Sequence, residues 1–247
     1  MAEAGEAVIV LDHVSASEGV LEHVEDFSLT VHKGEAVALV GANRSGKSLA
    51  LKLSAGMGEP SAGSVRLLGV DPAAASDEEV LQLRRRVGFV FAKPALISNM
   101  SVYSNVALPL RYHTTLPETT IRGKAMACLA ECGVELFHDH LPGGLAMGDA
   151  RLAALARALV IEPDILFVDE VLFGLDADDL IRFRGLLEKY RREKGLTIVA
   201  SINAPTALFA FMDRLALMRD GRLVALCPPA EAARVDDPMV PEFFGAS

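Results

Sequence analysis

One segment constrains this chain more than any other: a glycine-containing loop with a lysine, set between an apolar strand and a helix. The strand is predicted at residues 35–40, the loop is Gly41–Ser48 (GANRSGKS), and a helix is expected from Leu49 to Gly56. Glycines let consecutive backbone N–H groups curl around phosphate oxygens without Cβ clashes, and the following helix adds the positive end of its dipole. A glycine-rich turn without a ligand is the alternative, and the flanking strand and helix argue against it.

The side chains of this loop suit a nucleoside triphosphate and its Mg²⁺. Lys47 is expected to reach the β and γ phosphate oxygens, and the Ser48 hydroxyl is expected to coordinate Mg²⁺. ATP and Mg²⁺ are therefore the predicted ligands. The residues expected to contact the nucleotide are Gly41, Asn43, Arg44, Ser45, Gly46, Lys47, Ser48 and Leu49.

Two adjacent carboxylates end an apolar strand far downstream of the loop. The run at residues 165–168 leads directly into Asp169 and Glu170. In P-loop proteins the acid at a strand end holds Mg²⁺, usually through water, so Asp169 is the second predicted magnesium residue. Glu170 then stands where it could polarise the attacking water, and it is the predicted catalytic residue.

The rest of the chain alternates strand and helix patterns. Besides the strand before the loop, strands are predicted at residues 7–14, 27–32, 64–68, 87–91, 164–169, 196–200 and 214–218. Helical patterns lie between most of them, which predicts an α/β fold with a mainly parallel sheet. Residues 98–159 instead show helical patterns with little strand signal, and this indicates a helical subdomain inserted between two parts of the core.

Composition and charge argue against several other classes of protein. The 247 residues carry a formal net charge of −9, and a surface of that sign repels phosphate backbones, so no nucleic acid partner is expected. The N-terminus lacks the basic start, apolar stretch and small-residue cleavage site of a signal peptide. No run approaches the ~20 apolar residues needed to cross a bilayer. We expect a soluble protein that reaches a membrane only through another chain.

The cysteines and histidines are expected to be structural. Three cysteines are too few for a disulfide framework. Cys128 and Cys132 are spaced to share a helix face, which predicts packed thiols, with redox or metal use as the less favoured alternative. His138 and His140 flank a carboxylate and could ligate a metal, but such a set on a loop is more often solvated.

The motifs together resemble those of ABC-type ATPases. They follow that family's order and cover nearly the whole chain: the loop, then Arg85–Phe91, Ala153–Leu159, Glu162–Asp164, Phe167–Glu170 and Gly174–Asp176. The resemblance implies a P-loop NTPase core with a parallel sheet, a small antiparallel β part and an inserted helical subdomain. The implied boundaries are residues 1–91 and 160–226 for the α/β core, 92–159 for the helical subdomain with the signature region, and 227–247 for a loose C-terminal tail with one apolar anchor.

Two further segments point to one branch of that family. Ser101–Leu110 and the Asp236–Phe244 ending resemble the Mce-associated branch, the ATP-binding subunits of Mla-type bacterial lipid transporters. The resemblance implies a membrane permease as partner, docked near Ala92 to Val106, a second ABC subunit in a homodimer or heterodimer, and a Mce-type lipid-binding component. It also implies a peripheral location on the cytoplasmic side of the inner membrane of a bacterium.

Several positions depart from the family's pattern. Glu18, or Ser17 in an alternative alignment, stands where the family has an aromatic residue that stacks on adenine, and a side chain without a flat π face loses ~1–3 kcal/mol of base binding. Ala92 replaces a glutamine that contacts Mg²⁺ and the attacking water. Ile202 replaces the switch histidine that contacts the γ-phosphate.

The signature loop of the family aligns with Leu145–Asp149, and its central positions Ala146, Met147 and Gly148 form a changed sequence. Ala146 lacks the hydroxyl donor, Met147 puts a bulky side chain where a glycine allows close approach, and Asp149 adds a negative charge. This loop normally faces the γ-phosphate held by the opposite subunit of a head-to-tail dimer. The chain therefore departs from the pattern on both of the faces that form a nucleotide site.

These departures predict an ABC subunit that binds Mg-ATP but hydrolyses it weakly. A positioned polar group of this kind contributes typically ~10²–10⁴-fold to a rate, and such losses within one unit are not additive. Two alternatives stay open. The chain could be an active ATPase of the same family in which other residues take over, or a soluble adaptor that uses the fold as a binding module.

Overall fold

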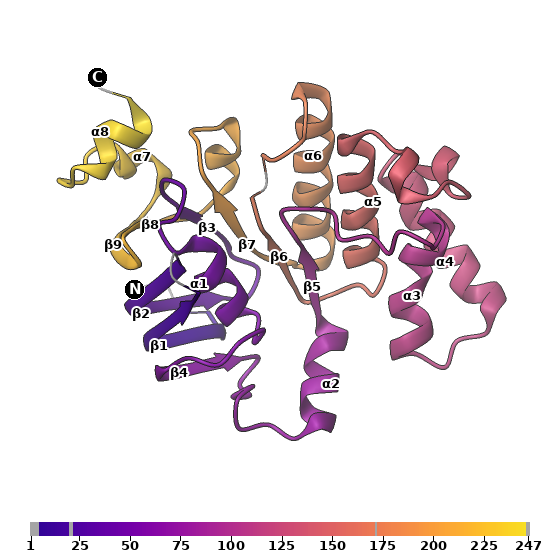
Figure 1. Ribbon diagram of the computed structural model, residues 1–247, viewed down its shortest axis with the longest axis horizontal. Coiled ribbons are helices and arrows are strands. Elements are labelled where there is room, and N and C mark those ends of the chain that lie inside the picture. The colour runs from indigo at the N-terminus through magenta and orange to yellow at the C-terminus, as the bar shows by residue number, and fades with distance from the viewer. Residues whose placement is uncertain (1–4, 20–21, 171, 246–247) are drawn as a thin grey trace. The chain divides into compact units, whose positions relative to one another are not determined.

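The computed structural model describes residues 5–19, 22–170 and 172–245. The chain consists of two compact units (Figure 1). The first comprises Met1–Leu83, Asp169–Val171 and Thr197–Ser247, and the second comprises Arg84–Val168 and Leu172–Leu196. The second unit is larger than the helical subdomain expected at residues 92–159, because it also contains two strands and a long helix.

A small antiparallel sheet forms one part of the first unit. Its strands are β1 (Ala7–Glu18), β2 (Glu22–His32) and β4 (Ala62–Leu67), in the order β2-β1-β4. Both pairings of β1 are antiparallel. β1 and β2 are longer than the sequence predicts, because irregular pairing within β1 interrupts the alternation of buried and exposed residues on which the prediction depends.

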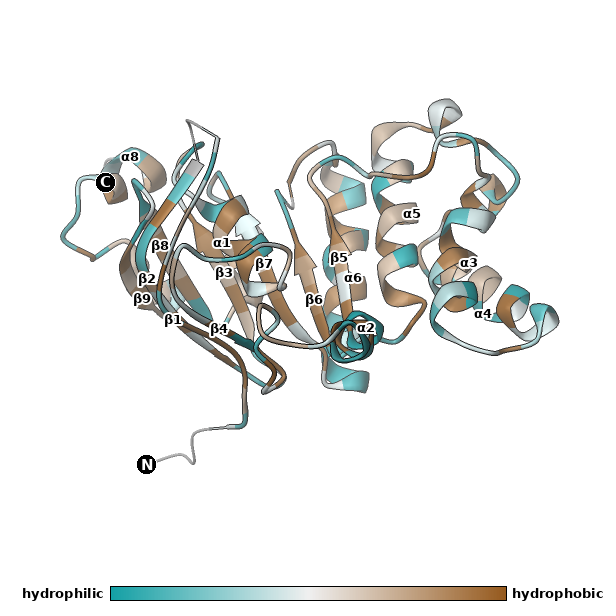
Figure 2. Cartoon of the chain, turned by 60° about the horizontal axis from the view of Figure 1, so that its bottom comes forward, coloured by the Kyte–Doolittle hydropathy of each residue, from teal (hydrophilic) through white to brown (hydrophobic). Residues whose placement is uncertain are grey.

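The second sheet of this unit is mainly parallel and has the order β7-β3-β8-β9. β3 (Ala36–Val40) pairs in parallel with β7 (Thr197–Ile202) and with β8 (Arg214–Arg219), and β8 pairs antiparallel with β9 (Arg222–Cys227). Every residue of β3 and β7 is buried, as expected for parallel strands covered on both faces, and β3 is brown in Figure 2.

Helices complete the first unit. α1 (Lys47–Ser54) packs against both β1 and β7, so one helix contacts both sheets. η3 (Ala207–Phe211), α7 (Pro229–Ala232) and α8 (Met239–Phe244) lie towards the C-terminus. The expectation of a loose tail is wrong, because this segment contains two helices. The expected apolar anchor is present: Met239 and Val240 are buried, and the Phe243 ring stacks on Phe209.

The second unit is mostly helical. It contains the parallel pair β5 (Val87–Val90) and β6 (Ile165–Val168). Its helices are α3 (Val102–His113), α4 (Glu118–Glu131), η1 (Glu135–Phe137), η2 (Pro142–Gly144), α5 (Met147–Leu159) and α6 (Ala177–Lys194). α2 (Asp77–Arg86), teal in Figure 2, begins in the first unit and ends in the second.

α5 is the central helix of the second unit. It packs against α3, α4, α6 and β5, and nearly all of its residues are buried. Its many alanines allow such close packing on several sides because they carry little side-chain volume. The helical subdomain, the parallel strands and the antiparallel sheet together confirm the predicted α/β fold class.

The prediction of packed thiols is confirmed, since Cys128, Cys132 and Cys227 are all buried. Among the described residues no three His, Cys, Asp or Glu side chains are grouped as metal ligands would be, and this includes His138 and His140. Within the same part of the chain, none of the helices has both the length and the apolar character that a membrane crossing requires.

Candidate functional site

The loop between β3 and α1 is tightly curled, and its glycines have steric reasons to be there. A Cβ on Gly41 would lie 2.3 Å from the Met218 carbonyl oxygen, and one on Gly46 would lie 2.5 Å from the His23 carbonyl oxygen. Gly46 also has a φ of 92° where it caps the N-terminus of α1, a conformation that favours glycine. The backbone therefore reaches a shape that a residue with a side chain could not adopt at these two positions.

Lys47 lies inside this curl. Its side chain is buried, and its ammonium group donates to the carbonyl oxygen of Ala42 at 2.6 Å and to Ser45 Oγ at 3.2 Å. An ammonium group held over the loop by the loop's own oxygens can exchange these acceptors for phosphate oxygens. The contact of Lys47 with the β and γ phosphate oxygens is compatible with this position and stays a prediction.

Ser48 and Asp169 meet, as the sequence predicts for a magnesium pair. Ser48 Oγ donates to Asp169 Oδ1 at 2.9 Å, and Ser201 Oγ donates to the same oxygen at 2.6 Å. The backbone N–H of Glu170 donates to Ser201 Oγ at 2.7 Å. Hydroxyl and carboxylate oxygens are the donors that Mg²⁺ prefers, so this group fits the ion.

Ser201 is a site residue that the sequence analysis missed. It is fully buried in β7 and connects the carboxylate of Asp169 to the backbone of Glu170. One signal could have identified it: a hydroxyl near the end of an otherwise apolar strand needs a partner, and strand-end acids are the obvious candidates.

Lys47 and Ser48 line a cavity of about 150 Å³. Its walls are formed by Asn43, Arg44, Gly46, Lys47, Ser48 and Glu170. Two cations, a hydroxyl group and one carboxylate therefore surround a space at the start of α1, where the helix dipole is positive. Such a site can hold phosphate and Mg²⁺, and Glu170 lines the same cavity, so its predicted role as a base for water stays a prediction.

Two of the changed positions lie in the first unit. Glu18, at the end of β1, is exposed and forms an ion pair with Lys52 of α1 at 2.7 Å. Ile202 ends β7 and is fully buried, and its carbonyl oxygen accepts from Gly41 N at 3.3 Å. The backbone of Ile202 thus supports the phosphate loop, while its side chain offers no donor.

Ala92 follows β5 in the second unit, where a buried arginine holds its segment. Arg151 of α5 donates through Nη1 to the carbonyl oxygen of Phe91 at 3.2 Å and also to that of Ala92. Arg151 is fully buried, and the sequence analysis missed it. An arginine inside an alanine-rich helix was the available signal, because an isolated buried charge requires partners.

The signature segment opens α5. Ala146 is the N-cap residue and makes no side-chain cap hydrogen bond. Met147 is 45% exposed and lies against Gly174, where a Cβ would be 2.2 Å from its Cγ. A Cβ on Gly148 would collide with the carboxylate of Asp179, whose pKa is raised by burial and by Asp176. Position 148 therefore has no room for a larger side chain unless Asp179 moves.

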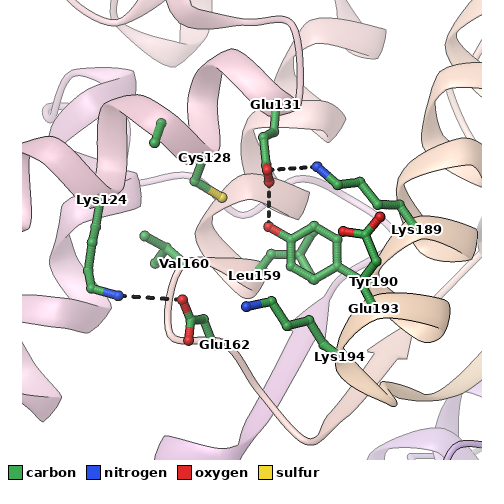
Figure 3. Close-up of a pocket in the computed structure, with 11 residues that line it drawn as sticks. Lys124, Cys128, Glu131, Leu159, Val160, Glu162, Lys189, Tyr190, Glu193 and Lys194 are labelled. Carbon is green, nitrogen blue, oxygen red and sulfur yellow. Dashed lines mark hydrogen bonds and ion pairs between the residues drawn. The ribbon is translucent and has the colours of Figure 1, made fainter.

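A larger hollow of about 340 Å³ lies in the second unit between α4, α5 and α6 (Figure 3). Its acids and lysines mainly pair with one another: Lys124 with Glu162 at 3.4 Å, and Lys189 with Glu131 at 2.9 Å. Tyr190 also donates to Glu131, and the hydrogen bonds from Lys189 and Tyr190 lower the pKa of that carboxyl. This hollow has no glycine loop and contains none of the predicted site residues.

Comparisons of the sequence with known proteins lead to one family. The family model described as "ABC transporter" matches residues 24–172. The methionine import ATP-binding protein MetN 1 of Rhodopseudomonas palustris is 33% identical over 201 residues, which are 81% of this chain and 54% of that protein. The intermembrane phospholipid transport system ATP-binding protein MlaF of Haemophilus influenzae is 30% identical over 220 residues, 89% of this chain and 83% of that protein. The chain spans little more than half the length of the MetN relative.

Solved structures agree as well. CbiO1 of Clostridium perfringens, part of the ABC transporter complex cbiONQ, superposes with a TM-score of 0.79 at 27% identity, covering 92% of this chain and 90% of that chain. The dimeric bacterial ABC transporter cassette MJ0796 superposes with a TM-score of 0.82 at 28% identity, covering 90% of this chain and 98% of that one. The phosphate loop, the magnesium pair and the strand topology lead to the same conclusion: this chain belongs to the ABC transporter family and is one of its ATP-binding domains.

Proposed function

We propose that this chain is the ATP-binding subunit of a bacterial ABC transporter that holds Mg-ATP and hydrolyses it slowly. One observation carries the proposal: Ser48 and Ser201 both donate to Asp169 beside the phosphate loop, while Ile202, next to Ser201, is a buried side chain without a donor. The groups that bind phosphate and Mg²⁺ are kept, and a group that would aim the attacking water is missing.

The other changed positions support weak hydrolysis for the same reason. Ala92 and Ala146 carry no polar side chain that could contact Mg²⁺, water or a phosphate. Each missing group takes away typically ~10²–10⁴-fold in rate, and because such groups act as a unit their losses do not simply multiply. Glu170 alone therefore gives little turnover, whereas binding depends on loop amides, Lys47 and the metal.

The proposed working form is a head-to-tail dimer in which ATP acts chiefly as a dimerising ligand. The similar cassette MJ0796 is a dimer. In a dimer of two copies of this chain, both sites would combine a sound phosphate loop with a changed signature segment. An intact partner would still leave each composite site short of one set of groups, so neither arrangement yields a fully equipped site.

For the transported substrate we propose a phospholipid or another lipid of the cell envelope. The similarity to MlaF supports this, because that match covers 83% of the MlaF chain, whereas the match to MetN 1 covers 54% of that protein. The proposed partners are a membrane permease and a Mce-type lipid-binding component, with the subunit on the cytoplasmic side of the inner membrane. Co-purification with such a permease tests this part, and purification without any membrane protein favours the adaptor.

Phosphate release at saturating Mg-ATP tests the catalytic part of the proposal. Glu170→Gln is expected to change turnover by less than about two-fold, because the base has no aligned water to activate. Glu59→Gln, which neutralises an exposed carboxylate in the same unit, is the matched control for the change of charge. A drop of ~10²-fold or more on Glu170→Gln alone would show that the chain is an active ATPase.

A further inference from the structure

Arg44 adopts a backbone conformation that usually belongs to glycine. Its φ is 67°, and it is the third residue of a turn in which the N–H of Ser45 donates to the carbonyl oxygen of Ala42 at 3.3 Å. A positive φ at the third position is a feature of type II turns, which favour glycine there. For an arginine this conformation brings Cβ too close to the following carbonyl oxygen, so the loop is strained at this residue.

The side chain of Arg44 stands at the phosphate cavity. It lines the space of about 150 Å³ together with Lys47, Ser48 and Glu170. It is exposed, and no hydrogen bond or ion pair joins it to any residue within the segments 5–19, 22–170 and 172–245. All five N–H donors of its guanidinium group are therefore available to a ligand.

The two cations at this cavity differ in what they can offer. Lys47 is buried and donates to two oxygens of the loop, so its ammonium group lies inside the curl. Arg44 is exposed at the opening, and a planar guanidinium matches two phosphate oxygens at once, which an ammonium group cannot do. The exposed guanidinium group of Arg44, next to the buried ammonium group of Lys47, is therefore suited to bind the terminal phosphate of a nucleotide.

We propose that Arg44 is a second phosphate-binding cation, which donates to the terminal phosphate of ATP from the same chain whose loop holds the nucleotide. The inference rests on the proposed Mg-ATP binding and deepens it. Because Ala146 and Ile202 carry no donor, Arg44 supplies a charged contact to the terminal phosphate without the opposite subunit. Backbone strain at a functional residue is the pattern expected when a site, rather than stability, selects the side chain.

Equilibrium binding of Mg-ATP and Mg-ADP to Arg44→Gly and to the unaltered protein tests the proposal. Arg44→Gly is expected to weaken ATP binding by about 10- to 100-fold, the effect of a lost charge-assisted hydrogen bond, and ADP binding by less than about three-fold. Its Tm without nucleotide is expected to rise, because glycine relieves the strained turn. Arg44→Lys keeps the positive charge but lacks the planar guanidinium group, and it is expected to bind ATP with intermediate affinity.

Arg66→Ala is the matched control, since it removes the same charge from β4 in the same unit, outside the loop. Equal ATP affinities in Arg44→Gly and the unaltered protein would overturn the inference. Equal losses of affinity for ATP and ADP would overturn it as well, because either result would mean that Arg44 does not contact the terminal phosphate. If the unaltered protein binds no Mg-ATP, the proposed function fails instead. The two failures are therefore distinguishable.

Discussion

The phosphate loop of the first unit and the signature segment of the second differ in how completely their polar groups are arranged. In the first, Lys47, Ser48 and Asp169 each have a defined hydrogen bond to a neighbouring group. In the second, α5 starts at Ala146 without a side-chain cap, and Met147 leaves an apolar side chain half exposed. This difference underlies the proposed function, in which nucleotide binding and hydrolysis depend on separate residues, so that hydrolysis can weaken while binding is kept.

A physical reason makes the two separable. The phosphate loop binds largely through backbone N–H groups, whose positions follow from glycines and from burial against β2 and β8. Hydrolysis needs a few side chains on other segments, aimed at one water molecule, and a single substitution removes any of them. Under the proposed function, phosphate binding by the loop is therefore kept when side chains needed for hydrolysis are lost.

Lys47→Ala, in the phosphate loop of the first unit, is expected to have the largest effect of the variants in this comparison. Removal of the buried ammonium group takes away a charge-assisted contact to the phosphates, and we expect a loss of ATP affinity of about 100-fold or more, measured with a fluorescent nucleotide. Lys52→Ala, on the same helix, removes an equal charge that pairs with Glu18 and is expected to leave affinity nearly unchanged. Unaltered affinity in Lys47→Ala would mean that the loop does not hold the nucleotide.

Sequence alone predicted the parts of the site that depend on continuous motifs. The phosphate loop and the Asp169–Glu170 pair could be located because strand, loop and helix follow one another along the chain. β9 was missed, although Asp220 and Gly221 both have positive φ, as in the tight hairpin turns that Asp-Gly pairs favour. That signal is local, and it could have been used.

Ser201 and Arg151 could not be assigned in the same way, because their roles depend on contacts between residues far apart in sequence. Ser201 meets Asp169 across 32 positions, and Arg151 reaches Phe91 across 60. Burial and hydrogen-bond need mark such residues as candidates, but the partner is fixed only when the strands and helices are packed. For this reason the sequence predicted Ser48 and Asp169 as magnesium residues and did not predict the hydrogen bond from Ser201 to Asp169.

Ser201→Ala is expected to have the next largest effect. It sharpens the comparison because it removes hydrogen bonds around Asp169 in the first unit and leaves the phosphate loop unchanged. The variant removes the buried hydroxyl that donates to Asp169 and accepts from the N–H of Glu170, which lowers the free energy of unfolding by about 1–3 kcal/mol. We also expect ATP binding to need more Mg²⁺, as measured by titration of the metal. Ser54→Ala removes a buried hydroxyl that donates to the Ala50 carbonyl in α1, and it should leave the metal dependence unchanged. An unchanged dependence in Ser201→Ala would separate Ser201 from the metal site.

Ala146→Ser is expected to have the smallest effect, and it tests the incomplete side directly. A serine at this N-cap position can accept a hydrogen bond from a backbone N–H in the first turn of α5, so the free energy of unfolding should rise by about 1 kcal/mol in chemical denaturation. Turnover should stay within about two-fold, because Ala92 and Ile202 still carry no polar group. Ala153→Ser places a hydroxyl in the buried interior of the same helix and should destabilise the protein. A large gain in phosphate release from Ala146→Ser would contradict the comparison, since the missing hydroxyl at position 146 alone would then account for the slow hydrolysis.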